Sequence, residues 1–405
     1  MMWGAILPPI VAEWLQMLLR WAHVVAGILW IGDSFLFMWM DASLEPSSRP
    51  REGAVAGELW MVHSGGFYEV VKRRFLAPHE MPRTLHWFRW EAYATWLTGF
   101  ALLVVVYWLG GAGFLEDPGV SGLGHGAAVA LSAGVLVLAW LIYDALWMSP
   151  LGRSAWAASI VSFALLAGAI AGLSSALSGR GAFLTTGALL GTIMAANVWR
   201  RVIPAQARML AATRAGTPVD VALGERAKQR SIHNHYLTLP VVFCMLSGHF
   251  PSTYGHPWRA LVLILFVVLG MTFKHWMNHR GRTPRVVVAA GLGALLALIA
   301  LTARPSGRPS AATAPALGQV PFSAVRAIVE RRCTTCHSAR PTNPSFPQAP
   351  AGVKLDDPER VRALAERIRV RAVETRTMPL GNLTGMTDAE RDTIAAWIAA
   401  GARAR

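Results

Sequence analysis

The sequence predicts an all-α chain in which a polytopic membrane helix bundle is followed by a small helical domain. Hydrophobic residues make up 54% of the 405 residues and charged residues only 15%. Several apolar runs reach the roughly 20 residues that a helix needs to cross a bilayer. A stretch rich in proline, alanine and serine then separates these runs from the rest of the chain. We therefore predict a bundle at residues 1–303, a linker at 304–319 and a domain at 320–405.

Apolar runs that could form spanning helices number about eight. They lie at residues 14–40, 86–110, 125–148, 154–177, 182–203, 234–253, 257–279 and 284–303. The sixth run is the weakest of these by composition because it carries polar residues at both ends. An even number of spans places both termini on the same side of the bilayer.

The basic residues predict which side that is. Seventeen lysine and arginine residues lie in four loops, at residues 41–85, 149–153, 200–233 and 280–285. The loops of the opposite side hold only Arg180 and Arg259. Cytoplasmic loops carry the excess of basic residues, so the first set is expected inside. This predicts a multi-pass protein of the bacterial inner membrane with both termini and the final domain in the periplasm.

The pentapeptide at residues 333–337 reads C-x-x-C-H, which is the attachment signature of a c-type haem. The thiols of Cys333 and Cys336 can reach the two vinyl groups of one porphyrin, and His337 can then ligate the iron. A zinc site would need a second pair of cysteine or histidine ligands, and residues 338–405 contain none. The motif predicts one covalent haem c, which bacteria attach outside the cytoplasmic membrane.

The final domain resembles small class I cytochromes c, which implies a methionine as second axial ligand about 40 residues after the motif. Met378, which precedes a proline in a loop, fits that resemblance. Met386 is the alternative, but it directly precedes Thr387, a good N-cap for a helix at about 389–400. We expect Met378 to be the ligand and Met386 to be a packing residue. A first helix at about 322–332 would lead into the motif.

The net charge of +15 is shared between the inner loops and the last part of the chain. Residues 304–405 hold 16 basic and 9 acidic side chains. Such a surface could steer an acidic partner or an anionic membrane surface towards the domain, or it could be an ordinary solvated face. Nucleic acid is not expected as a partner of an outward-facing haem domain.

Histidines are concentrated in the bundle, where eleven of the twelve lie. Ionisable residues within spans are costly, which makes them candidates for function, although a single histidine is more often a core residue bonded to a carbonyl. Together they predict one or two b-type haems. By depth, His23 pairs with His249 on the outer side, and His86 pairs with His275 on the inner side.

A polar and aromatic cluster is expected at the inner face, drawn from residues 63–93 and 228–238. It could bind a flat anion, with aromatic faces for stacking and cations for charge. The candidate catalytic residues are His63, His86, Glu91 and His233. The candidate substrate-binding residues are Lys72, Arg89, Trp90, Asn234 and Tyr236. An interfacial aromatic belt would explain Arg89 and Trp90, but it explains Glu91 and the histidines of 228–238 poorly.

These segments resemble those of the membrane-bound, cytochrome c-containing urate oxidase (urate hydroxylase) family of bacteria. The matching segments are Leu19-Arg20-Trp21-Ala22-His23, residues 27–32, 63–68, 86–93, 143–144, 197–198, 227–236 and 247–251, and the C-x-x-C-H domain. The resemblance covers nearly the full chain, in the order of spans followed by cytochrome. Gly248 departs from it, since an asparagine is expected there.

The resemblance implies oxidation of urate to 5-hydroxyisourate with water as the oxygen source and without hydrogen peroxide. The electrons would pass through haem to the cytochrome domain, and from there to a cytochrome c or a terminal oxidase. The main alternative is a quinol-oxidising cytochrome b/c protein, which would need a lipid-accessible quinone pocket. A second alternative is a non-enzymatic electron conduit, and this alternative predicts few haem ligands in the spans.

Overall fold

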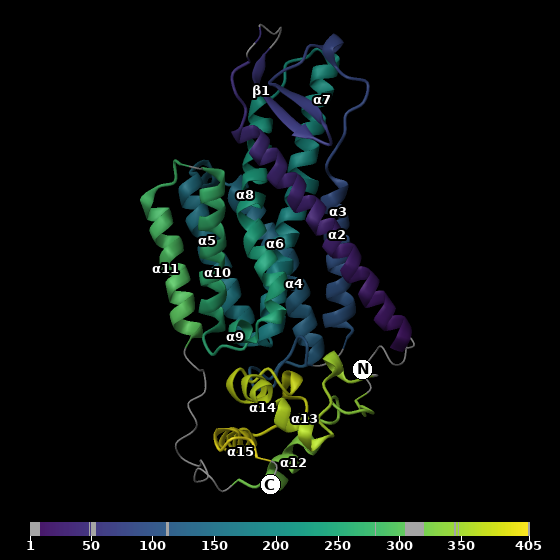
Figure 1. Ribbon diagram of the computed structural model, residues 1–405. Coiled ribbons are helices and arrows are strands. Elements are labelled where there is room, and N and C mark those ends of the chain that lie inside the picture. The colour runs from purple at the N-terminus through teal and green to yellow at the C-terminus, as the bar shows by residue number, and fades with distance from the viewer. Residues whose placement is uncertain are drawn as a thin grey trace.

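The computed structural model describes residues 9–47, 49, 54–110, 113–279, 281–303, 320–343, 346 and 348–403. A long helix bundle carries a smaller helical unit, residues 320–403, at one end (Figure 1). We call this the C-terminal unit and the bundle end beside it the proximal end. The distal end carries a β-hairpin and α7 (Ile203–Ala215) (Figure 1). The predicted linker at 304–319 lies outside the described residues.

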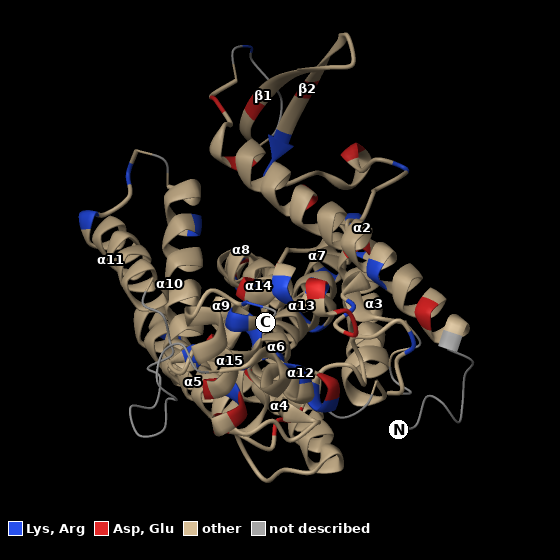
Figure 2. Cartoon of the chain, turned by 60° about the horizontal axis from the view of Figure 1, so that its bottom comes forward, with Lys and Arg blue, Asp and Glu red and all other residues tan. Residues whose placement is uncertain are grey.

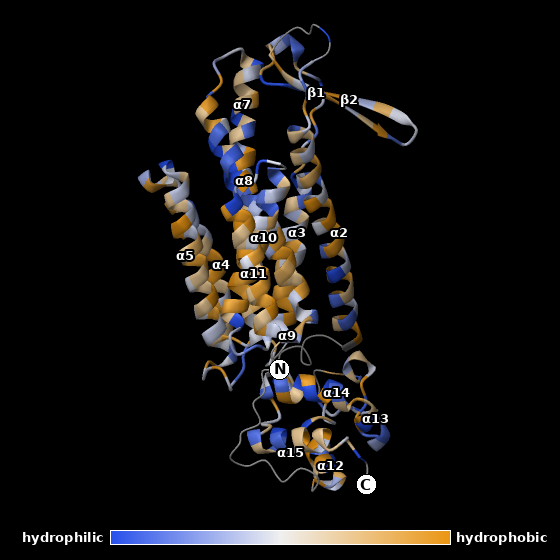
Figure 3. Ribbon diagram, turned by 60° about the vertical axis from the view of Figure 1, so that its left-hand side comes forward, coloured by the Kyte–Doolittle hydropathy of each residue, from blue (hydrophilic) through white to orange (hydrophobic). Residues whose placement is uncertain are grey.

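Long helices run between the two ends of the bundle. They are α2 (Pro9–Ala42), α3 (Trp90–Leu102), α4 (His125–Met148), α5 (Ala155–Ala176), α6 (Gly179–Asn197), α8 (Val221–Leu246), α10 (Arg259–Asn278) and α11 (Arg285–Thr302). Seven helices of the described chain are long and apolar enough to cross a membrane, judged by length and composition. Figure 3, coloured by the hydropathy of each residue, shows many hydrophobic residues along these helices. This is the composition expected of a membrane protein.

Helix α8 is not among those seven, although the sixth predicted span, 234–253, begins inside it. Its first half carries Glu225, Arg226, Lys228 and Arg230, which lower its mean hydropathy. It ends at Leu246, and a short 3₁₀ turn, η5 (Ser247–His249), follows. The helix still packs against α6 and α10. The count of eight spans stays a prediction.

Helix α6 is the centre of the bundle. About two thirds of its apolar window (67%) is buried, far more than in the other candidate spans. At Gly187 a Cβ atom would lie 2.6 Å from the Cβ of Cys244 in α8, so only glycine permits this close approach. Cys244 is buried there, as expected for a small core residue.

An ion triad fastens three segments near the distal end. Asp144 of α4 accepts hydrogen bonds from Arg201, in a π-helical turn after α6, and from Arg230 of α8 at 2.9 Å. The Arg230 side chain is only 4% exposed. A charge that is buried this deeply is tolerated only when it is paired, so Asp144 is needed to keep the distal ends of α4 and α8 together.

One element was missed by the prediction of an all-α chain. Strands β1 (Val55–His63) and β2 (Gly66–Arg73) form an antiparallel hairpin with His63 opposite Gly66. Ser64 and Gly65 both have positive φ, of 50° and 75°, which matches the right-handed twist of a two-residue hairpin turn. The hairpin projects from the distal end (Figure 3).

The C-terminal unit has a hydrophobic core of its own. It contains α12 (Phe322–Arg332), α13 (Pro358–Ala363), α14 (Ala365–Ile368) and α15 (Asp388–Ala399). Phe322, Ile394 and Trp397 are among its core residues. As predicted, Thr387 caps the last helix, and Glu390 completes a capping box with it.

The C-terminal unit lies against the proximal end of the bundle. The hydroxyl of Tyr254, in the short helix α9 (Pro251–Tyr254), accepts hydrogen bonds from Arg180 at 3.1 Å and from Arg371 at 3.2 Å. Phe114 and Phe346 meet with ring centroids 6.5 Å apart. Figure 2 shows that charged residues gather on the C-terminal helices and at loops, while the walls of the bundle are mostly uncharged.

We predict that Asp144→Asn destabilises the protein by about 3–5 kcal/mol, because it leaves Arg230 buried without a counterion. The measurement is thermal or denaturant unfolding of the purified protein in detergent. Glu330→Gln is the matched control: it breaks the exposed Arg326–Glu330 pair and should cost less than about 0.5 kcal/mol. Equal stability of the two variants would show that the triad does not fasten the helices.

Candidate functional site

The C-x-x-C-H motif lies beside a cavity of about 400 Å³ in the C-terminal unit. Helix α12 ends at Arg332, and the chain then turns so that the His337 amide donates to the Cys333 carbonyl at 2.8 Å. Cys333, Cys336, His337 and Met378 all line the cavity. Two thiols, an imidazole and a thioether around one mostly apolar space are the donor set of a covalently held haem with His and Met ligation.

His337 is positioned to offer one ring nitrogen. Its Nδ1 lies 3.2 Å from the Val353 carbonyl, so Nδ1 carries the proton that it donates there. Nε2 is then the unprotonated nitrogen that can ligate iron. Burial lowers the pKa of His337, against the hydrogen bond to Val353. The ring is therefore neutral at physiological pH, as a ligand must be.

Cys333 and Cys336 are both free thiols in the structure. Burial, with the neighbouring Cys336, raises the pKa of the Cys333 thiol to about 12. A thiol with so high a pKa is not a thiolate nucleophile at neutral pH, so Cys333 is not poised for thiol–disulfide exchange.

The two methionines have different surroundings. Met386 is 3% exposed and belongs to the core of the C-terminal unit. Met378 lines the cavity, and its backbone is held from both sides: its amide donates to the Arg371 carbonyl, and its carbonyl accepts from Arg391, both at 2.9 Å. The structure thus brings Met378, and not Met386, to the motif.

Two bundle residues that the sequence analysis did not select, Phe114 and Arg180, also line this cavity. The signal for Arg180 was present in the sequence, because it is one of two basic residues expected on the outer side. An arginine at the edge of a porphyrin-sized cavity is suited to the carboxylates of such a group. The bundle therefore completes the wall of the cavity.

The outer histidines lie in unlike settings. His23 is half-buried on α2, and its Nδ1 lies 3.0 Å from the Thr95 carbonyl and 3.2 Å from the Thr98 hydroxyl. Its ring packs on Gly99 of α3, where a Cβ would be 2.7 Å away. His249 is exposed in η5. No contact between His23 and His249 is found in the described chain.

The inner pair is also not in direct contact within the described residues. His275 stacks on His279 with centroids 4.2 Å apart, and its Nδ1 lies 2.8 Å from the Tyr236 hydroxyl. His86 is exposed in the segment that precedes α3. The structure thus places Tyr236 beside His275 and leaves His86 at the surface.

The remaining predicted inner residues divide between the hairpin, the start of α3 and α8. His63 is exposed at the hairpin turn, and Lys72 of β2 pairs with Asp41 at 2.5 Å. Arg89 lies over the rings of Trp87 and Trp90, 5.8 Å and 5.5 Å from their centroids. Among the described residues, the hairpin and α8 do not form the single cluster that the sequence predicts.

In α8 the predicted His-Asn-His-Tyr run enters a polar network. The Tyr143 hydroxyl lies 2.6 Å from Nδ1 of His233 and accepts a hydrogen bond from Asn197 at 3.1 Å. Asn197 also donates to Asn234 at 3.0 Å. Tyr143 and Asn197 join His233 and Asn234 in this network, and the sequence analysis had assigned neither of them a role.

Lys274 of α10 is the functional candidate that the sequence analysis missed most clearly. Its side chain is completely buried, and Nζ lies 3.4 Å from the ring centroid of Phe35 in α2. In the part of the chain that the structure describes, this ammonium has no hydrogen-bond partner. It lies within electrostatic range of the His235 ring. A lysine inside an apolar run was a signal in its own right.

Other buried polar atoms without partners accompany Lys274. Among the described residues, most of these atoms belong to the distal half of the bundle: Arg89 Nε, Glu91 Oε2, Trp140 Nε1, Asn197 Oδ1, Arg230 Nη1, Lys274 Nζ and Asn278 Oδ1. Buried polar groups are normally paired, and an unpaired set indicates a missing ligand or water. The set includes donors, acceptors and one unpaired cation.

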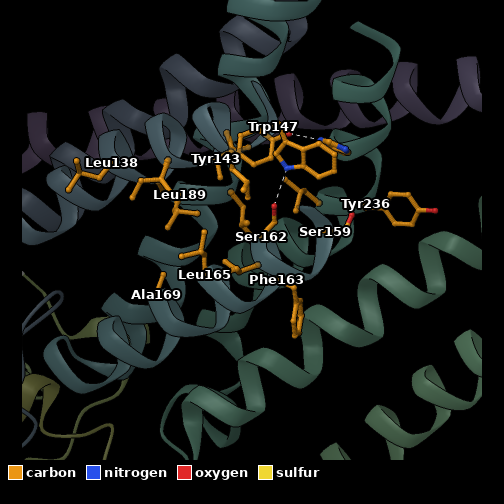
Figure 4. A pocket seen from close by; sticks show the side chains of 18 of the residues that line it. Leu138, Tyr143, Trp147, Ser159, Ser162, Phe163, Leu165, Ala169, Leu189 and Tyr236 are labelled. Carbon is orange, nitrogen blue, oxygen red and sulfur yellow. Dashed lines mark hydrogen bonds between the residues drawn. The ribbon is translucent and has the colours of Figure 1, made fainter. Parts of the chain in front are cut away.

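A second, larger cavity of about 640 Å³ lies between α4, α5, α6, α8 and α10. Figure 4 shows its residues, with Trp147 and Tyr143 grouped apart from Leu138 and Ala169. Of the described residues that line it, none is acidic, lysine or arginine. His233 reaches it, so this predicted catalytic residue borders an apolar space.

Comparison with known proteins gives one match. A family described as Urate oxidase N-terminal matches residues 9–304. No curated protein and no solved structure matches the chain. The matched region is the whole described bundle and excludes the C-terminal unit.

Proposed function

Because the chain belongs to the urate oxidase N-terminal family, we propose that it oxidises urate in the distal half of the bundle and passes the electrons to a haem c in the C-terminal unit. Urate and water give 5-hydroxyisourate, two protons and two electrons. Oxygen is not the direct acceptor in this proposal, so hydrogen peroxide is not formed. The electrons continue to a cytochrome c or a terminal oxidase.

The observation that carries the location is the buried, unpaired ammonium of Lys274. Leaving a buried charge without a partner costs several kcal/mol, so a bound anion would stabilise this site strongly. Urate is a planar anion with both donors and acceptors on its edges. The unpaired atoms of the distal half, such as Arg89 Nε and Asn278 Oδ1, offer complementary donors and acceptors.

We assign the general base to Glu91, in the first turn of α3. One of its carboxylate oxygens, Oε2, is buried without a described partner and can accept a proton from urate or from the attacking water. His233 offers only one free ring nitrogen, since Tyr143 occupies the other. Roles for His63 and His86, which are exposed, stay predictions.

In the C-terminal unit, Cys333 and Cys336 would hold the porphyrin, and His337 and Met378 would ligate its iron. Such a haem supplies one-electron transfer at a raised potential. Phe114 and Arg180 would bring the bundle to its edge. The orientation that we propose puts this unit in the periplasm of a bacterial inner membrane and urate on the cytoplasmic side. One or two b-type haems, with His23 and His249 or His86 and His275 as ligands, stay a prediction, since the structure does not bring the members of either pair together.

The decisive experiment is addition of urate to isolated membranes without oxygen, read at the absorption band of the c-type haem. We expect reduction of the haem and formation of 5-hydroxyisourate. Formation of stoichiometric hydrogen peroxide by the purified protein would contradict the proposal.

For the substrate anion, we predict that Lys274→Met raises the KM for urate by about tenfold or more, because urate loses one charge-assisted hydrogen bond. The thermal midpoint should not fall, because the variant removes an unpaired buried charge. Steady-state kinetics and unfolding measure both effects. Lys228→Met, at an exposed position of α8, is the control and should behave as wild type. An unchanged KM in Lys274→Met would place urate elsewhere.

For the base, we predict that Glu91→Gln lowers kcat by about 10² or more without loss of covalent haem. The acid limb of the pH profile of kcat/KM should also disappear, which a purely structural role would not produce. Glu225→Gln, at an exposed position of α8, is the matched control. A Glu91→Gln enzyme with a normal pH profile would exclude Glu91 as the base.

For the axial ligand, we predict that Met378→Ala abolishes the charge-transfer absorption of an iron–sulfur bond in the oxidised protein. Met386→Ala should keep that absorption and instead lose stability, by about 2–5 kcal/mol, because it opens a cavity in the core. The opposite spectroscopic result would reverse the assignment.

A further inference from the structure

The 640 Å³ cavity opens through the wall of the bundle. Leu138 and Ile142 of α4 and Leu165 of α5 line it and are 56%, 50% and 48% exposed. These helices are candidate membrane spans, so the exposed leucine and isoleucine side chains face hydrocarbon. A ligand would therefore reach this cavity from the lipid.

The cavity wall is apolar and uncharged over most of its length. Leu138, Ala169 and Leu189 come from the middle of their helices, and the described lining includes no acidic residue, lysine or arginine. An anion such as urate would find no counterion here. The volume lies within the range of 300–1,000 Å³ typical of sites for small ligands. The cavity suits a neutral, largely hydrophobic molecule.

Polar groups gather at the distal end of the cavity only. Tyr143 and Trp147 come from the last turns of α4, and Ser159 and Ser162 come from the first turns of α5 (Figure 4). The Trp147 indole donates to Ser162 at 3.0 Å, and its ring lies 4.1 Å from that of His233, centroid to centroid. An aromatic wall with hydroxyls and one imidazole is suited to a flat ring that carries oxygen atoms.

The hydrogen bonds fix the role of His233. The Tyr143 hydroxyl accepts from Asn197, and we assign its own proton to Nδ1 of His233, which gives each of the three groups a partner. Nδ1 is the acceptor nitrogen of the ring, and the proton lies on Nε2. Nε2–H is then a donor available to a carbonyl oxygen in the cavity.

We propose that this cavity binds a lipid-soluble quinone, with the ring at the distal end beside Trp147 and His233 and the isoprenoid tail leaving past Leu138. A lipid acyl chain would leave the polar end unused. A b-type haem would call for two axial ligands and cations for its propionates, whereas the described lining offers one histidine and no lysine or arginine. The amphipathic cavity fits a quinone better than either.

The role of the quinone rests on the proposed function, although its binding does not. Oxidation of urate by water releases two electrons and two protons. One quinone takes up two electrons and two protons and becomes a quinol, so the two half-reactions balance. The quinone is thus a second exit for the electrons of urate, within the membrane.

The binding test uses decylubiquinone and purified protein in quinone-free phosphatidylcholine nanodiscs. Wild type should bind one decylubiquinone per chain. Leu138→Trp narrows the opening and should weaken binding about tenfold or more. Val137→Trp, the neighbouring exposed position outside the cavity lining, should bind as wild type. Absence of saturable binding to wild type, or equal binding by the two tryptophan variants, would overturn the site.

Two further measurements separate a quinone from other occupants. Tyr143→Phe should weaken decylubiquinone binding about tenfold, because it removes the hydroxyl that holds the His233 ring as a donor to the quinone. Unchanged binding would identify a site for hydrocarbon tails only. Haem content by pyridine haemochrome should be equal in wild type and Leu138→Trp. Selective loss of haem from Leu138→Trp would show that the cavity holds haem and would overturn the proposal.

The acceptor role is tested with urate and decylubiquinone under anaerobic conditions. Wild type should form one quinol per urate. In Leu138→Trp the rate of quinol formation should fall about tenfold, while urate still reduces its haem c at the wild-type rate. If urate reduces the haem but no quinol forms, the acceptor role is wrong. If urate reduces neither the haem c nor the quinone, the proposed function is wrong, and the binding test alone then decides whether the cavity is a quinone site.

Discussion

The bundle depends on one constraint: a polar group within hydrocarbon has to find its partner inside the chain. Asp144 meets this constraint for Arg201 and Arg230, and through them it ties α4 to α8 and to the turn after α6. In the same region, Asn197 donates hydrogen bonds to both Tyr143 and Asn234. Where partners exist, the polar residues fix how the helices lie. Where they do not, as at Lys274, the same constraint identifies a place for a ligand.

The two ends of the bundle are built for different tasks. At the proximal end, Tyr254 accepts from an arginine of the bundle and from an arginine of the C-terminal unit, and Arg180 reaches both Tyr254 and the cavity at Cys333. At the distal end, buried donors and acceptors lack partners within the described chain. A reaction that starts with a polar substrate at one end and finishes at a redox group at the other would use this separation.

The sequence predicted what local patterns determine. The final helix followed from Thr387, because a helix cap is specified by residues close to it in the sequence. The position of Met378 beside the motif was expected from the resemblance to small cytochromes c. The hairpin at residues 55–73 was missed, because the hydropathy of the sequence does not distinguish two short strands from an ordinary loop between spans. The contribution of Phe114 and Arg180 to the C-terminal cavity could not be foreseen, because it depends on how two separate parts of the chain pack.

Lys274 and the lipid-facing cavity illustrate a further limit of the sequence. The lysine in the apolar run at 257–279 is visible in the sequence, but its burial without a partner is not. A cavity between five helices has no sequence pattern at all. The structure shows that the two places have opposite chemistry: one holds an unpaired cation, and the other has no charged residue among its described lining. A single ligand cannot satisfy both. An anion would suit the surroundings of Lys274, and a neutral ring would suit those of Tyr143 and His233. Helix α8 contributes a histidine to each place, His235 to the first and His233 to the second. Only Asn234 separates these two histidines on the helix, so the unpaired cation and the uncharged cavity lie at about the same depth in the bundle.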